Sequence, residues 1–312
     1  MNQRPDRRRR TITRPSVLTR TLTVLIAAVL LPSALVTGLA SQPTHAGIAA
    51  ASTPQASHTS GAVVVAWNKE LLQILATPGA QPATVHPTRS LAMLQAAIYD
   101  AVVSITHTGP AYLFSLDAPA GARPDAAAAE AGHDTLAALY PSFKSTLDQQ
   151  LNAELNAIPN GSAKQHGIEV GNLAASFIVA ERANDGSNTT PPVFVPGTQP
   201  GTYRPTPPFV NGAIFTQWSS VMPFVLQRAD QFRPAAPPPL TSAAYARAIN
   251  EVKSLGQNTS TTRTAEQTTI AKFWPGPIWI TWNEIAEQSA LAHHTDLVRV
   301  ARLFAVMNLS FA

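Results

Sequence analysis

Apolar residues recur every three or four positions along most of the chain, which is the spacing of one buried face of an α-helix. The first such repeat comprises Val64, Trp67, Leu71, Leu72 and Leu75, and Pro78-Gly79 ends it. Further segments with this period cover residues 89–107, 125–139, 143–155, 162–180, 242–255, 264–274, 278–293 and 296–312. No stretch shows sustained alternation with a period of two. The pattern therefore predicts an all-α fold built from helical bundles.

Polar residues that cap helices precede several of these segments. Thr88 is the expected cap of the second helix, Thr241 or Ser242 of the sixth, and Thr295 or Asp296 of the last. Thr264 with Gln267 has the spacing of a capping box. Gly256 lies where the residue just past a helix end is expected.

Residues 186–240 interrupt the helical pattern and contain much of the proline. Proline lacks a backbone donor and fixes φ, so this segment is predicted to be neither helix nor central strand. Aromatic residues are spread through it, at Phe194, Phe209, Phe215, Trp218, Phe224 and Phe232. Because disordered linkers contain few aromatic residues, we expect a long ordered Pro/aromatic-rich loop lying over the helical core.

The last helical segment has an apolar stripe and no capping residue at its end. The stripe comprises Leu297, Val300, Ala301, Phe304, Met307 and Phe311. A helix commonly ends in Gly or Asn, with basic residues in its last turn. We therefore expect a chain that is truncated before a second bundle is complete, whose last helix lacks its packing partner and frays from Ile278 onward.

Residues 1–46 resemble an export signal, with seven arginines before an uncharged apolar stretch from Thr21 to Ala40. Thr44-His45-Ala46 is the expected cleavage site. A retained membrane anchor is the alternative, but Pro32 and Gly38 interrupt the stretch, so no stable membrane span is expected after cleavage. Arg9-Arg10 leaves the choice between twin-arginine and general secretion open. Residues 47–60 are small and polar and are predicted to form a disordered leader, followed by a helical domain at 61–312.

Removal of the export signal changes the charge of the chain. The full sequence has a net charge of +4, but loss of residues 1–46 leaves 15 basic and 17 acidic side chains. Nucleic acid is therefore not an expected partner. The sequence contains no cysteine, which excludes disulfides and thiolate metal sites and is compatible with a secreted, oxidising location.

Few residues have a spacing that suggests chemistry. His293 and His294 lie near Asp296, Glu284 and Glu287, but adjacent helical residues point about 100° apart, so we interpret them as a polar helix junction. His133-Asp134 is interpreted as part of a solvated helix face. Trp274, Trp279 and Trp282 surround a Pro-Gly-Pro break and are expected to be core anchors rather than a ligand platform. No nucleophile elbow and no phosphate-binding loop occurs.

The order of the short motifs resembles that of the bacterial vanadium-dependent haloperoxidases, relatives of the type 2 phosphatidic acid phosphatases. The matching residues are Trp67-Asn68, Arg89, Tyr99-Asp100-Ala101, Gly201-Thr-Tyr-Arg-Pro-Thr-Pro-Pro208, Trp218, Pro237-Pro-Pro-Leu240, Ser242, Tyr245, Glu251-Val-Lys253, Gly256, Arg263-Thr264, Gln267, Phe273-Trp274, Trp282-Asn283, Ala301-Arg-Leu-Phe-Ala305 and Asn308. They span about residues 62–312.

The resemblance implies two helical bundles, the second of which holds vanadate as cofactor. Hydrogen peroxide and halide would be the substrates, and a homodimer the candidate assembly. In that family the vanadate-binding lysine, arginine, Ser-Gly-His and Arg…His motifs follow the Ala-Arg-Leu-Phe-Ala helix. This sequence ends before them, and no displaced copies occur: Ala131-Gly132-His133 has alanine where the hydroxyl is required. We therefore assign no catalytic, cofactor-binding or metal-binding residue, and expect no vanadate to bind this chain.

Three functions fit these observations. The first is the N-terminal part of an exported haloperoxidase-like enzyme, inactive by itself. The second is an equally incomplete phosphatase of the related class. The third is an exported non-catalytic helical binding module, for which the apolar stripe from Leu297 to Phe311 would be the interface.

Overall fold

The computed structural model describes residues 60–208 and 212–312. The expected export signal at 1–46 and nearly all of the expected leader at 47–60 lie outside these ranges. Within them the structure is all-α, as predicted. The elements are α1 (Ala62–Ala76), α2 (Pro87–Thr106), α3 (Pro124–Leu139), η1 (Pro141–Phe143), α4 (Lys144–Asn156), α5 (Ser162–Glu181), η2 (Trp218–Ser220), α6 (Ala243–Gly256), α7 (Ala265–Phe273), α8 (Ile278–Ala292) and α9 (Leu297–Phe311). Among the described residues, no helix is long and apolar enough to cross a bilayer.

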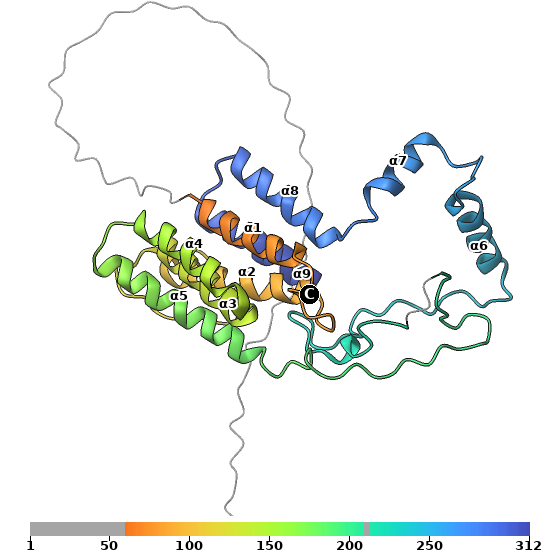
Figure 1. Ribbon diagram of the computed structural model, residues 1–312, viewed down its shortest axis with the longest axis horizontal. Coiled ribbons are helices and arrows are strands. Elements are labelled where there is room, and N and C mark those ends of the chain that lie inside the picture. The colour runs from red at the N-terminus through yellow and green to blue at the C-terminus, as the bar shows by residue number, and fades with distance from the viewer. Residues whose placement is uncertain (1–59, 209–211) are drawn as a thin grey trace, which may run out of the picture. The chain divides into compact units, whose positions relative to one another are not determined.

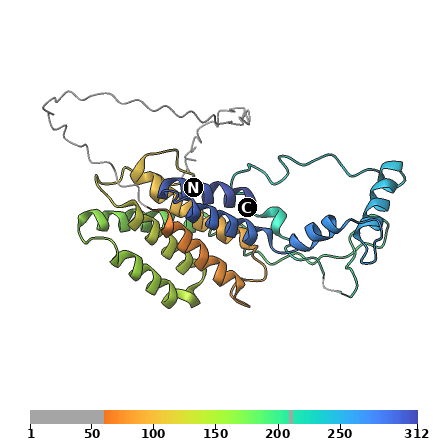
Figure 2. The same cartoon turned by 90° about the horizontal axis from the view of Figure 1, so that it is seen from above.

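Helix α2 is the centre of the bundle. It packs against α3, α5 and α9, while α1 packs against α3, α2 and α9 (Figures 1 and 2). Its side chains are buried around most of the helix, including Leu91, Leu94, Ile98 and Val102, each with no exposed surface. A helix that is apolar on all sides is stable only when other helices surround it, so the position of α2 follows from its composition.

The interface between α1 and α3 depends on a glycine. A Cβ atom added at Gly132 on α3 would lie 2.5 Å from Cγ of Trp67 on α1. Trp67 is fully buried in the space that the missing side chain leaves. The close approach of these two helices therefore requires glycine at this position.

The expectation that α9 lacks a packing partner is wrong. Leu297, Val300, Ala301 and Phe304 are buried, and α9 packs along α2 with further contacts to α1 and α8. Asp296 caps the helix by accepting a hydrogen bond from the Arg299 backbone N–H at 2.9 Å. The stripe is thus covered by a helix more than 190 residues earlier in the chain, a pairing that the local pattern does not encode.

Two other cap expectations also need correction. Helix α2 begins one residue before Thr88, and its cap is His86, whose Nδ1 accepts from the Thr88 backbone N–H at 3.3 Å. Gly256 is the last residue of α6 rather than the residue beyond it. Ser242 and Thr264 cap α6 and α7 as predicted, and Thr264 forms the capping box with Gln267.

The Pro/aromatic-rich loop contacts the core only in part. Gln217, Val221 and Phe224 are buried, whereas Phe232 is 76% exposed. Phe209 lies outside the described residues. The following helices α6 and α7 bury none of their residues. The expected position over the core therefore holds for residues 217–224.

Candidate functional site

Two buried arginines attach the loop to the bundle. Arg89 in the first turn of α2 donates from Nε to Asp185 Oδ2 at 2.7 Å, and from Nη2 to the Arg182 carbonyl at 2.7 Å. Burial disfavours the ionised form of Asp185, but hydrogen bonds from Arg89 and Ser187 outweigh it and lower its pKa. The charge of the Arg89 guanidinium is therefore paired, and its Nε and Nη2 donors are directed at protein acceptors.

Arg182, just after α5, connects the bundle to residues 222–224. Its guanidinium donates to the carbonyls of Met222 at 2.8 Å and Pro223 at 3.3 Å, and lies 3.6 Å from the centre of the Phe224 ring. Tyr112 donates to the Phe224 carbonyl at 2.5 Å. Carbonyl acceptors and an aromatic face together satisfy this buried cation.

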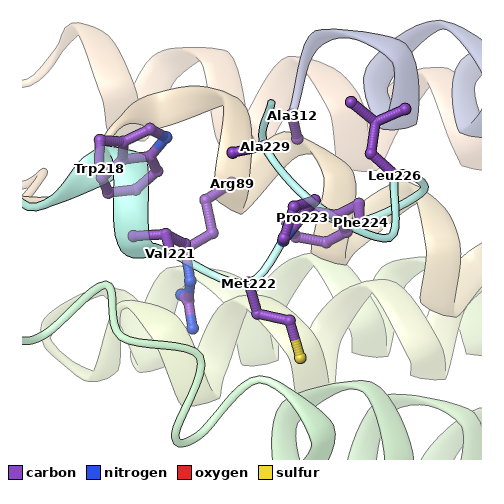
Figure 3. A pocket seen from close by; sticks show the side chains of 9 residues that line it. All are labelled: Arg89, Trp218, Val221, Met222, Pro223, Phe224, Leu226, Ala229 and Ala312. Atoms are coloured by element: carbon purple, nitrogen blue, oxygen red, sulfur yellow. The ribbon is translucent and has the colours of Figure 1, made fainter. Parts of the chain in front are cut away.

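A cavity of about 200 Å³ lies beside this junction (Figure 3). The close-up shows Trp218, Val221, Met222, Pro223, Phe224, Leu226, Ala229 and Ala312 around it, and the Arg89 side chain extends away toward the helices below. Its lining is mainly apolar. The cavity therefore offers mainly shape and apolar contact to a ligand.

The residues described do not fit vanadate. An oxyanion of this kind needs several donors converging on one point. Arg89 is paired with Asp185, and Arg182 is bound to carbonyls and an aromatic ring. We therefore derive no chemical step through vanadate from residues 60–208 and 212–312.

Amide and carboxyl side chains form a second buried network, between α1, α2, α8 and α9. Gln95 donates to Asn68 Oδ1, and Asn68 donates to Glu287 Oε1, both at 2.8 Å. Asn283 and Asn308 exchange hydrogen bonds of 2.9 and 3.0 Å. Burial raises the pKa of Glu287. These contacts fix which helix faces meet, because a mispaired polar group in the core would lose its partner.

A third cluster surrounds His133 on α3, and here the expectation of a solvated face is wrong. His133 is only 7% exposed. Its Nδ1 lies 2.8 Å from Asp134 Oδ1, and its Nε2 lies 2.8 Å from Asp148 Oδ1 on α4. Hydrogen bonding to Asp134 is the main cause of its raised pKa, with Asp148 adding to it. Burial raises the pKa of the neighbouring Glu130 to about 7.

Glu130, His133 and Asp134 are the group of described residues that could hold a metal ion, since their ligand atoms lie within 4.8 Å of one another. Two contacts oppose this. Both His133 nitrogens already face carboxylates. The Lys144 ammonium lies 2.7 Å from Asp148 and supplies a positive charge there. The arrangement is that of an ion-pair network.

The other residues considered from sequence are separated in the structure. His293 and His294 are exposed at the end of α8, whereas Glu287 points into the core toward Asn68. The expectation that the three tryptophans anchor the core is wrong for two of them: Trp274 and Trp282 are each 42% exposed, while Trp279 packs on the core. Trp274 and Trp282 lie with ring centres 6.2 Å apart.

Reasoning from the sequence did not predict these networks as sites, although it named several of their members. Asn68, Arg89, Asn283 and Asn308 belong to the motifs of the family resemblance. All of them are buried. A polar residue on the apolar face of a predicted helix indicates a buried polar contact, because such a residue needs a partner from another helix.

Comparisons with known proteins support the fold. The crystal structure described as that of the first bacterial vanadium-dependent iodoperoxidase matches with a TM-score of 0.66 at 19% sequence identity. The match covers 80% of this chain and 66% of that chain, so this chain spans just under two thirds of that protein's length. No protein-family model and no curated protein matches the sequence. The chain has a vanadium haloperoxidase-like fold, as the motif resemblance implied.

Proposed function

We propose that this chain is the N-terminal helical part of an exported vanadium-dependent haloperoxidase-like enzyme, and that it does not oxidise halide by itself. The fold likeness to an iodoperoxidase structure carries the proposal. Arg89 and Arg182 donate hydrogen bonds to protein oxygens, which supports the proposal that the chain does not oxidise halide by itself. Vanadate would be bound by residues that this chain does not contain, and hydrogen peroxide and halide would react there.

Exposed apolar side chains on three consecutive helices indicate that these helices pack against a further partner. Val252 on α6 is 68% exposed, Phe273 on α7 is 61% exposed, and Trp282 on α8 is 42% exposed. Exposed apolar surface on several neighbouring elements is typical of an interface. The same observation favours the alternative of an exported non-catalytic helical binding module. The interface expected for it, the stripe from Leu297 to Phe311, is covered by α2, so its interface would be formed by α6, α7 and α8 instead.

An activity assay tests the proposal. The chain from Gly47 onward, incubated with orthovanadate, hydrogen peroxide and iodide, is expected to form triiodide no faster than vanadate without protein. A longer product, encoded by the source DNA continuing past the codon for Ala312, is expected to form it rapidly. Vanadate-dependent iodide oxidation by the shorter chain would overturn the claim of inactivity. Hydrolysis of p-nitrophenyl phosphate without peroxidase activity in the longer product would favour the phosphatase alternative.

Export is tested separately. The secreted protein is expected to begin at Gly47, after cleavage behind Ala46. Intact-mass measurement of protein from the culture medium distinguishes this from a retained segment, since a protein that still carries residues 1–46 would contradict the proposed signal.

A further inference from the structure

Helix α4 is attached to the bundle by few apolar contacts. Leu147 is its one buried residue, with Leu151 partly buried against the core. One buried leucine side chain holds α4 less firmly than the many buried side chains of α2 and α3 hold those helices. Two polar contacts to other helices add to this attachment: Asp148 with His133 on α3, and Glu154 with Trp67 on α1.

The first contact requires a proton on each nitrogen of His133. Ionised carboxylates only accept hydrogen bonds, and a neutral imidazole has one N–H and one lone pair. With carboxylate oxygens 2.8 Å from both nitrogens, a neutral ring would direct its lone pair at one carboxylate. The geometry is therefore that of an imidazolium ion bridging Asp134 and Asp148.

Side chains from α1, α3, α4 and α5 surround His133, and those on α3 and α4 carry the charges. Glu130 and Asp134 lie on α3, and Asp148 and Lys144 lie on α4, while Asn172 on α5 donates to Asp134 Oδ2 at 2.7 Å. The uncharged Trp67 ring packs near His133 from α1, with ring centres 6.2 Å apart and the rings steeply inclined to one another. Lys144 and Asp148 belong to the same helix, so their ion pair does not connect α4 to α3. Among the groups named here, His133 is the cation that makes this connection.

The second contact also titrates. Trp67 Nε1 donates to Glu154 Oε2 at 2.8 Å, and Gln150 donates to Glu154 Oε1 at 3.2 Å. Burial raises the pKa of Glu154 to about 7. Burial favours the neutral carboxyl, whereas both hydrogen bonds favour the carboxylate. Ionisation therefore keeps the Trp67 hydrogen bond, and it is the burial of the new charge that lowers stability as pH rises from the ordinary glutamate range through 7.

We propose that α4 is a pH-dependent element, clamped to α3 by the His133 bridge under acidic conditions and released from α3 as His133 loses the proton that one of its two carboxylate contacts requires. Ionisation of Glu154 lowers stability in the same direction through burial of its charge, while its hydrogen bond to Trp67 persists. The stabilisation by His133 is complete below its ordinary pKa and is lost as pH rises through its raised native value. Release would leave the α2–α3–α5 packing in place, since α2 and α5 hold α3 independently of α4.

Amide hydrogen exchange on the full chain tests this, with rates corrected for the intrinsic pH dependence of exchange. Protection factors in α4 are expected to fall between pH 5.5 and 9, by roughly tenfold for each unit by which the native pKa of His133 exceeds its ordinary value. Protection in α5 is expected to change much less. Protection in α4 that stays constant over this range would overturn the proposal, as would a fall of equal size in α4 and α5.

Variants separate the two groups. His133→Gln is expected to lower the hydrogen-exchange protection of α4 at pH 5.5 and to flatten its dependence on pH. Glu154→Gln keeps an acceptor for Trp67, so the part of the pH dependence that comes from His133 should remain. His293→Gln, at an exposed position, is the matched control and should behave as wild type. If His133→Gln does not fold, the ¹⁵N shifts of the wild-type ring decide. Two protonated nitrogens at pH 7.5, where an ordinary histidine is mostly neutral, support the bridge, and one unprotonated nitrogen at this pH overturns it. None of these readouts depends on the proposed enzymatic function.

Discussion

Arg89 on α2 and Asp185 beyond α5 form a buried ion pair with 2.7 Å between Nε and Oδ2, although they are 96 residues apart in the sequence. Their side chains are 8% and 1% exposed. The pair joins the start of the central helix to the loop that returns over the bundle. Removal of either charge would leave the other buried without a partner.

Replacement of Asp185 by Asn is therefore expected to be strongly destabilising. It leaves the Arg89 guanidinium buried without an opposite charge, which costs about 3–5 kcal/mol in the free energy of unfolding. Urea denaturation measures this. Asp230→Asn is the matched control, since Asp230 pairs with Arg228 at the surface and such a pair contributes at most about 1 kcal/mol. Equal effects of the two substitutions would show that Arg89 has solvent access.

Gly132→Ala is expected to push α1 and α3 apart. The new methyl group would overlap the Trp67 ring, and overpacking in a core typically costs about 1–3 kcal/mol. Gly276→Ala is the control, because nothing lies within 4 Å of a Cβ at that position. The melting temperature should fall for the first variant and change little for the second. A stable Gly132→Ala protein with unchanged Trp67 fluorescence would contradict the close packing.

Asn308→Ala is expected to destabilise the contact between α8 and α9. It removes the partner of Asn283 in the core and leaves buried amide groups unsatisfied, at a cost of about 1–3 kcal/mol. The double variant Asn283→Leu/Asn308→Leu removes both polar groups and should be less destabilised than the single variant. A double-mutant cycle with additive effects would show that the two amides do not interact.

Asp100→Asn is expected to loosen the segment after α2. The carboxylate accepts hydrogen bonds from the backbone N–H groups of Tyr112, Leu113 and Phe114, and an amide oxygen can replace only some of these while its NH₂ group faces donors. Loss of net hydrogen bonding to a charged acceptor costs about 1.5–3 kcal/mol. Asp117→Asn, at an exposed position, is the control. Hydrogen exchange of residues 112–114 should increase only in the first variant.

The Asp100 carboxyl also makes the free energy of unfolding depend on pH. Burial raises the pKa of Asp100 to about 6, against the opposing effect of the three N–H donors. A raised native pKa means that the fold favours the protonated form, so this group lowers stability as pH rises from about 4 through 6. In Asp100→Asn this part of the stability profile should flatten. An unchanged profile would show that Asp100 does not titrate in this range.

Local signals in the sequence determined the helices and their caps. The spacing of apolar residues located each helix to within a few positions, and Ser242, Thr264 and Asp296 cap their helices as their side-chain chemistry predicts. These features depend on residues within a turn or two of one another, so the sequence alone contains them. The sequence did not predict His86 as the cap of α2, because histidine is not among the usual capping residues.

Contacts between distant segments decided the rest. The apolar face of α9 indicated burial but not its partner, which is α2. From the sequence, His133 and Asp134 are interpreted as part of a solvated face. In the fold, Asp148 on α4 lies beside the second ring nitrogen of His133. Which helix covers a given apolar stripe, and which carboxylate meets a given cation, depends on how all the helices pack together. The sequence by itself therefore determined the helical elements and the family resemblance, while the tertiary structure alone decided the burial, protonation and pairing of the polar residues, because those properties arise from neighbours that are remote in the chain.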